Sequence, residues 1–146
     1  MLAVRVHRME ASRGQAWFRS ALLVGVAYGL IGRLFALPAS DVHAWRLAAW
    51  IVSGAVYAAH IGYEHFRLRS SPRLTALHVA VAGAIGACAL VVAGMLHDLW
   101  TASTIRPVWL LALVVLPAVT AVPAFLGGLV AGATLRRFSA ERSRAT

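Results

Sequence analysis

The sequence predicts an all-α fold, a four-transmembrane-helix bundle with both termini in the cytoplasm. Three observations support this prediction. The chain of 146 residues is 60% hydrophobic and only 13% charged, and its mean hydropathy is +0.74. The apolar residues gather in four segments, each with about the twenty residues that cross some 30 Å of hydrocarbon. All 14 basic residues are arginines, and they lie mostly at the ends of these segments.

The four segments form a single predicted membrane domain, 1–146. A basic arm, 1–15, precedes the helices, and an arginine-rich tail, 136–146, follows them. Because the tail has no apolar periodicity, we expect it to be disordered. The helices are expected at about 16–37, 42–66, 74–96 and 107–135.

The first predicted helix, 16–37, has a basic region followed by an apolar run, as a secretory signal does. Arg33 interrupts the apolar run, and the residues before Pro38 match a cleavage site poorly. A retained helix is therefore favoured. In the short turn that follows, Ser40 or Asp41 is placed to cap the second helix.

The remaining connections carry the residues that end helices. Residues 67–73 include two serines, a proline and three arginines, a composition typical of a loop. Residues 97–106 are polar enough for a loop or an interfacial helix, and Pro107 suits the first turn of the fourth helix. Inside that helix, Pro117 and Pro123 each remove a backbone donor and predict a kink.

The arginines are divided unequally between the two sides of this arrangement. One side carries only three, Arg33, Arg46 and Arg106, whereas the other side carries the remaining eleven of the 14. Basic residues are retained on the cytoplasmic side of membrane proteins. We therefore expect both termini and the 67–73 loop in the cytoplasm, most simply at a bacterial inner membrane. Because topology explains the positive charge, nucleic acid is not an expected partner.

One polar stripe runs along the second predicted helix. Its members recur every three or four residues and so share a helix face. At 1.5 Å per residue, His60 lies about 9 Å and Glu64 about 15 Å from the midplane. His78 of the third predicted helix lies about 10 Å from it, on the same side. We therefore expect a polar cluster between these two helices, made of Tyr57, His60, Glu64 and His78.

Four interpretations of this cluster are open. It can be a hydrogen-bond network that fixes the register of two helices, a divalent metal site with imidazole and carboxylate ligands, or a proton or ion path through Glu64. In a haem b site, His60 and His78 would be the axial ligands. Three arginines would contact the haem propionates or, without haem, phospholipid headgroups: Arg67, Arg69 and Arg73.

A second polar group is expected at the opposite interface, and its mixed charges indicate a ring of salt bridges. Its members are Arg33, Asp41, His43, Arg46, His97, Asp98 and Arg106. Cys88 is the only cysteine and lies in mid-membrane, so no disulfide is expected.

The sequence contains no nucleophile, base and acid set, no phosphate-binding loop and no pair of catalytic carboxylates. An enzyme is therefore not predicted. The preferred interpretation is an accessory or assembly subunit that contacts membrane lipids and associates with itself or with a larger membrane protein. The alternatives are a haem b-binding redox subunit and a small proton or metal-ion transporter.

Overall fold

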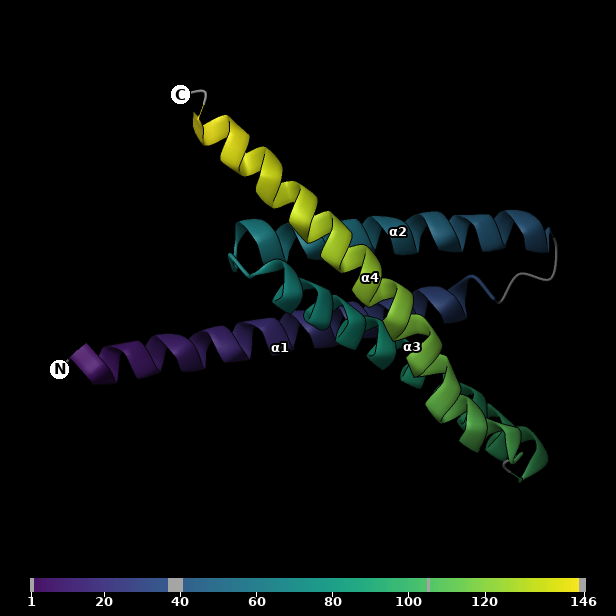
Figure 1. The fold of residues 1–146 in the computed structure, drawn as a ribbon. Helices are drawn as coiled ribbons and strands as arrows, with labels where there is room; N and C mark the ends of the chain where they lie inside the picture. The colour runs from purple at the N-terminus through teal and green to yellow at the C-terminus, as the bar shows by residue number, and fades with distance from the viewer. Residues whose placement is uncertain (1, 37–40, 105, 145–146) are drawn as a thin grey trace.

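The computed structural model of the chain describes residues 2–36, 41–104 and 106–144. These residues form four α-helices and no strand, which confirms the all-α prediction for them (Figure 1). The helices are α1 (Leu2–Leu34), α2 (Val42–Phe66), α3 (Pro72–Ala102) and α4 (Val108–Arg144). Two of them, α3 and α4, are long and apolar enough to cross a membrane.

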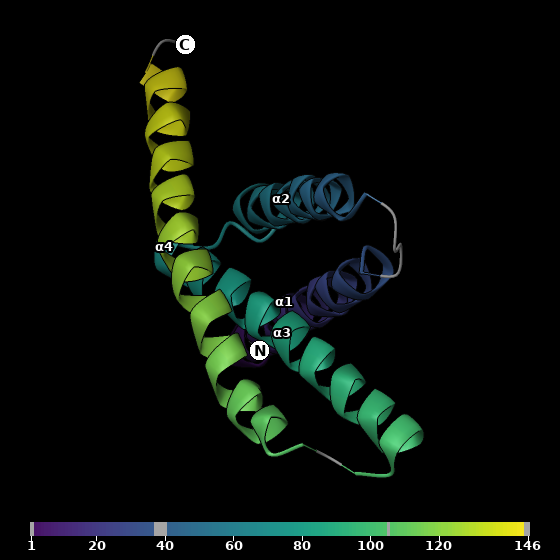
Figure 2. The same cartoon turned by 90° about the vertical axis from the view of Figure 1, so that its right-hand side faces the viewer.

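The helix α3 is the centre of the arrangement, because it packs along both α1 and α4. The helices α1 and α2 run in opposite directions, as do α3 and α4, and the second pair crosses the first (Figures 1 and 2). Both chain ends and the α2–α3 connection lie toward one end of the assembly. The α1–α2 and α3–α4 connections lie toward the other end.

Small residues form the two main helix contacts. A Cβ added to Gly25 of α1 would lie 2.6 Å from the side chain of Ile85 on α3. A Cβ added to Gly128 of α4 would lie 2.9 Å from the Cα atom of Ala76 on α3. Close backbone approach of this kind holds helices together where water exclusion does not. The chain therefore uses glycine and alanine on both sides of α3.

The helix α2 is the least embedded of the helices that pack on α3. Its buried residues are His60, Ile61 and Glu64, all near its C-terminal end. Toward its N-terminal end, Trp50 is 77% exposed and Ile51 is 64% exposed. The buried part of α2 is therefore a short, largely polar patch near its C-terminal end, and nearer its N-terminal end Trp45 contacts Phe35 edge-on with ring centroids 5.7 Å apart.

Three helices are longer than the sequence pattern predicted. The helix α1 begins at Leu2, so most of the 1–15 arm is helical. The helix α3 continues to Ala102, and α4 continues to Arg144 through most of the 136–146 tail. These extensions contain no proline and many good helix formers, so nothing in the backbone ends the helix where the apolar pattern ends. Positions 1, 145 and 146 of the arm and the tail lie outside the described residues, as does position 37, the predicted end of the first helix, which ends at Leu34 in the structure.

The helix starts differ in how they are capped. Asp41 occupies the predicted N-cap position of α2, but its backbone is left-handed with φ 52° and its side chain makes no cap hydrogen bond. The alternative cap, Ser40, lies outside the described residues. At the start of α3, the Ser71 hydroxyl accepts a hydrogen bond from the Leu74 amide at 3.3 Å, with Pro72 in the first turn. This start follows the usual capping chemistry.

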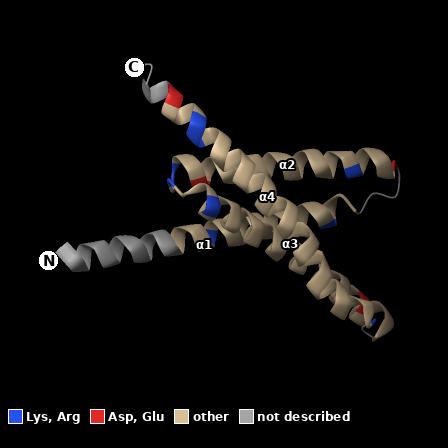
Figure 3. Ribbon diagram, in the orientation of Figure 1, with Lys and Arg blue, Asp and Glu red and all other residues tan. Residues whose placement is uncertain are grey.

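The helix α4 runs without a break through Pro117 and Pro123. Figure 2 shows it changing direction along its length, as expected where prolines remove backbone donors and crowd the preceding turn. Among the residues coloured in Figure 3, charged residues lie mostly toward the ends of the assembly, and the central segments of α2, α3 and α4 carry none. This distribution is typical of helices whose central segments face hydrocarbon.

Candidate functional site

The end of α2 folds back so that the chain enters α3 beside its own last turn. The amides of Arg67 and Leu68 donate to the carbonyl of Tyr63 at 2.9 and 3.3 Å, and the amide of Ser70 donates to the carbonyl of Glu64 at 3.1 Å. Hydrogen bonds of this type satisfy the last carbonyls of a helix. The turn therefore places the Ser70 side chain against the last turn of α2.

Glu64 is the centre of the buried polar cluster. Its Oε2 atom accepts a hydrogen bond from the Ser70 hydroxyl at 2.8 Å and lies 2.9 Å from Nδ1 of His78. Its Oε1 atom lies 3.8 Å from Nε2 of His60, one helical turn earlier. The exposed fractions are 0% for Glu64, 3% for His60 and 6% for His78. The predicted meeting of these three residues is thus present in the structure.

The helix α1 also contributes to this cluster. The indole ring of Trp17 stacks on the His78 imidazole, with ring centroids 4.4 Å apart and planes 4° from parallel. A stacked ring limits the rotation of the imidazole that faces Glu64. The cluster is therefore the place where α1, α2 and α3 are joined.

Several polar atoms of this cluster have no hydrogen-bond partner. They are Oε1 of Glu64 and both ring nitrogens of His60, all of which are buried. A buried polar atom without a partner costs free energy and needs an explanation, such as a bound water, ion or proton. The Glu64 oxygen that faces Ser70 and His78 therefore has hydrogen-bond partners, whereas the other Glu64 oxygen and the His60 nitrogens have none.

Tyr57 does not join the cluster, although it shares a face of α2 with His60. Its hydroxyl donates to the carbonyl of Ala124 on α4 at 2.7 Å. A Cβ at Gly127 would lie 2.7 Å from this hydroxyl, so glycine leaves the space that the tyrosine occupies. Tyr57 thus provides a second attachment of α2, to a different helix.

The arginines of the α2–α3 connection are exposed rather than paired with Glu64. Arg67, Arg69 and Arg73 surround the turn, and Arg69 has a left-handed backbone with φ 51°. Within the part of the chain that the structure describes, the ion pairs of Glu64 are with His60 and His78 alone. The three arginines are therefore free to contact anionic groups outside the bundle.

The predicted salt-bridge ring at the opposite interface is reduced to one pair in the structure. Arg106 donates to Asp98 through Nε at 2.6 Å and Nη2 at 3.2 Å. The indole of Trp109 donates to the same carboxylate at 2.6 Å. Among the described residues, the other predicted members make no ion pair; they are Arg33, Asp41, His43, Arg46 and His97.

The arrangement does not fit the two cofactors considered from the sequence. Among residues 2–36, 41–104 and 106–144, no group of three or more His, Cys, Asp or Glu side chains is arranged to hold a metal ion. A bis-histidine haem needs two imidazoles facing one iron from opposite sides. Here His60 and His78 both face the carboxylate of Glu64, and Trp17 covers one face of the His78 ring.

Two residues of the cluster were not foreseen from the sequence. Ser70 lies in a loop whose conformation no periodicity predicts, and the only signal was its place in a Ser-Ser-Pro turn. Trp17 lies near the end of an apolar segment, where tryptophan is typical of a membrane interface. Nothing in the sequence therefore indicated that Trp17 would stack on His78.

No protein-family model, curated protein or solved structure matches the chain. Function is therefore argued from the chain's own geometry. The cluster can do two things chemically: it can join helices through hydrogen bonds, and it can bind a proton or a water on its unsatisfied side.

Proposed function

We propose that the chain is a small integral protein of a cytoplasmic membrane that acts as an accessory or assembly subunit. Its partner is a second copy of itself or a larger membrane protein. One observation carries this proposal: α2 and α4 present long apolar faces that the rest of the chain does not cover. The most apolar 18-residue stretch of α4 has 0% of its residues buried.

Individual side chains give the extent of these faces. On α4, Val114 is 70% exposed and Val130 is 68% exposed. On α2, Trp50 and Ile51 are 77% and 64% exposed. Lipid tails can cover such surfaces, and so can the helices of a partner protein. Contact with lipid alone does not explain why α2 and α4 leave so much of their apolar surface uncovered by the rest of the chain. The open side of α2 is the surface where we expect the partner.

The Glu64 cluster has a structural role in this proposal. It fixes one end of α2 to α1 and α3, while the Trp50 end of α2 remains available. Hydrogen bonds between membrane helices stabilise their association by about 0.6 to 2 kcal/mol each. The cluster thus holds α2 in place without covering the face that a partner would bind.

Membrane orientation follows from charge. We propose that α1 and α2 cross the membrane beside α3 and α4, with both termini and the α2–α3 connection in the cytoplasm. The arginines of that connection would then lie at the level of anionic lipid headgroups, which attract basic residues near the membrane surface. The Asp98–Arg106 pair would lie at the opposite interface.

The test is the mass of the protein extracted with its surrounding lipid in polymer discs, measured by light scattering. We expect a homo-oligomer or a complex of fixed stoichiometry. Replacing Trp50 and Ile51 by Ala should dissociate this oligomer or complex, so that the measured mass falls to that of the single chain. Replacing the equally exposed Trp100, 81% exposed at the far end of α3, should leave it intact. A strictly monomeric, partner-free protein would contradict the proposal.

A second function is favoured by the unsatisfied side of the cluster. Buried acids and histidines in membrane helices mark proton paths in many proteins, and Oε1 of Glu64 and both nitrogens of His60 have no partner. As a proton transporter, the protein in liposomes should dissipate a pH gradient reported by an internal dye. Glu64→Gln should abolish the flux, and Glu141→Gln, at an exposed position of α4, should not. A proton flux that is the same in the wild type and in Glu64→Gln would contradict this second function.

A further inference from the structure

A cavity of about 740 Å³ lies between the four helices, apart from the Glu64 cluster. All four helices contribute to its lining, but His60, Glu64 and His78 do not. Its volume falls within the range of about 300 to 1,000 Å³ that is usual for small-molecule sites. The cavity is partly open to the surroundings, so a ligand in the membrane could enter it.

The lining is almost entirely apolar. It includes the aromatic side chains of Tyr28, Trp50 and Tyr57 and several glycines, such as Gly54 and Gly83, which add no side chain to the cavity. Aromatic side chains beside glycine leave flat spaces and favour stacking with a planar ring. This surface therefore suits a flat apolar molecule.

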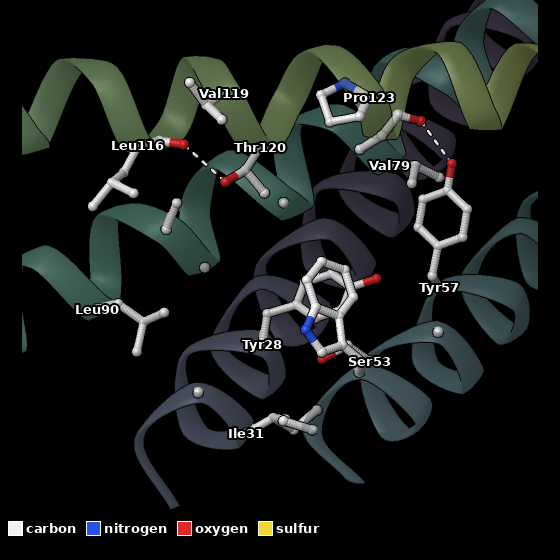
Figure 4. A pocket seen from close by; sticks show the side chains of 18 of the residues that line it. Tyr28, Ile31, Ser53, Tyr57, Val79, Leu90, Leu116, Val119, Thr120 and Pro123 are labelled. Atoms are coloured by element: carbon white, nitrogen blue, oxygen red, sulfur yellow. Dashed lines mark hydrogen bonds between the residues drawn. The ribbon is translucent and has the colours of Figure 1, made fainter. Parts of the chain in front are cut away.

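Only a few hydroxyl groups border the cavity, and two of them are already engaged. Tyr57 donates to the carbonyl of Ala124 at 2.7 Å, and Thr120 donates to the carbonyl of Leu116 at 2.8 Å (Figure 4). The hydroxyl of Tyr28 is buried and has no partner. Its ring extends from α1 into the space that Tyr57 and Ser53 border from α2. Among the described lining residues, Tyr28 thus carries the buried donor without a partner, while the Ser53 hydroxyl and the Trp50 indole, which are less buried, make no hydrogen bond either.

Depth restricts what the ligand can be. The lining residues of α2, α3 and α4 belong to the central parts of these helices, and those of α1 lie in its last two turns, within the apolar stretch that ends before Arg33. Among the described residues, charged residues lie mostly toward the ends of the assembly (Figure 3). The polar groups of a phospholipid lie at the membrane interface and do not reach the bilayer centre. A ligand that brings an acceptor to this depth has to be dissolved in the hydrocarbon as a whole.

We propose that this cavity binds a membrane-soluble quinone, a planar apolar ring with carbonyl acceptors and a hydrocarbon tail. One carbonyl oxygen accepts the hydrogen bond of Tyr28, and the ring packs among the aromatic side chains of α1 and α2. This site depends on the chain lying in a membrane, and it shares Trp50 with the partner surface proposed above, so the variants that test it leave Trp50 and Ile51 unchanged. Its failure and the failure of that role are therefore separate results.

The chain offers matched variants for the test. Tyr28→Phe removes only the unpaired hydroxyl, so it should leave the fold intact. Gly54→Leu places a side chain in the cavity, because a Cβ at Gly54 meets nothing within 4 Å. Gly62→Leu is the control: it lies on the same helix, has the same open space and does not line the cavity.

The experiment titrates decylubiquinone into the purified full chain in detergent and follows tryptophan fluorescence, since Trp50 borders the site. We expect saturable quenching in the wild type and in Gly62→Leu. Binding should weaken about tenfold in Tyr28→Phe, the loss of one hydrogen bond. Gly54→Leu should abolish it. Tyr63→Phe, at an exposed tyrosine of α2, should bind as the wild type does.

Three results would overturn the proposal. The first is quenching that does not saturate, and the second is equal affinity in the wild type and Tyr28→Phe. The third is full recovery of the fluorescence when hexadecane is added at a concentration equal to that of the bound decylubiquinone, which would make the cavity a site for hydrocarbon chains alone. If Gly54→Leu does not fold, Tyr28→Phe still decides between these results.

Discussion

Replacing Glu64 by alanine should weaken the packing of α2 on α3, because this carboxylate makes the buried polar contact between the two helices. The variant loses the hydrogen bond from Ser70 at 2.8 Å and the contact with His78 at 2.9 Å. Each such bond contributes about 0.6 to 2 kcal/mol between membrane helices, and His78 is left buried without its partner. We expect the free energy of unfolding to fall by about 2 to 4 kcal/mol.

Glutamine at the same position keeps the shape and one acceptor oxygen, so its effect should be about half as large. Both variants can be measured by titrating the protein in mixed micelles with sodium dodecyl sulfate and following its far-ultraviolet circular dichroism. Glu141→Ala, at an exposed position, should stay within about 0.5 kcal/mol of the wild type. A Glu64→Ala variant as stable as the wild type would refute the structural role of the cluster.

Two further predictions use the same titration. Tyr57→Phe removes the bond to Ala124 and should lower the free energy of unfolding by about 0.5 to 1.5 kcal/mol; no change would mean that this bond does not hold α2 on α4. Gly86→Ala places a Cβ 2.6 Å from a tyrosine side chain of α1 and should destabilise the protein by about 1 to 3 kcal/mol. Gly62→Ala, which meets open space, should be neutral or stabilising by up to about 1 kcal/mol; equal effects of the two alanines would contradict the packing.

The helices and most of the polar cluster were predictable from the sequence because both depend on spacing. His60 and Glu64 are four residues apart and must share a helix face. Counting residues from the middle of each segment placed His78 at the same depth. These arguments need only the geometry of straight helices and the length that a membrane requires.

Contacts that depend on how the helices cross were not predictable. Tyr57 has the right spacing for the cluster, but α2 meets α4 at that residue, and the Gly127 gap accepts the hydroxyl. Ser70 reaches Glu64 only because the turn before it takes a left-handed backbone at Arg69. Helix ends were also missed, because polar residues with good helix propensity continue an α-helix beyond its apolar stretch.

Crossing of the membrane by all four helices is the claim on which the other proposals depend, and α1 and α2 are the helices at which it is tested. Single cysteines can be placed in a Cys88→Ala chain at the exposed positions His43, Arg73, Ala102 and Ala140 and tested in intact cells with a membrane-impermeant maleimide. We expect labelling from outside at His43 and Ala102, and labelling only after the cells are opened at Arg73 and Ala140. If His43 is protected together with Arg73 while Ala102 is labelled, only α3 and α4 cross the membrane, and the four-span account is contradicted.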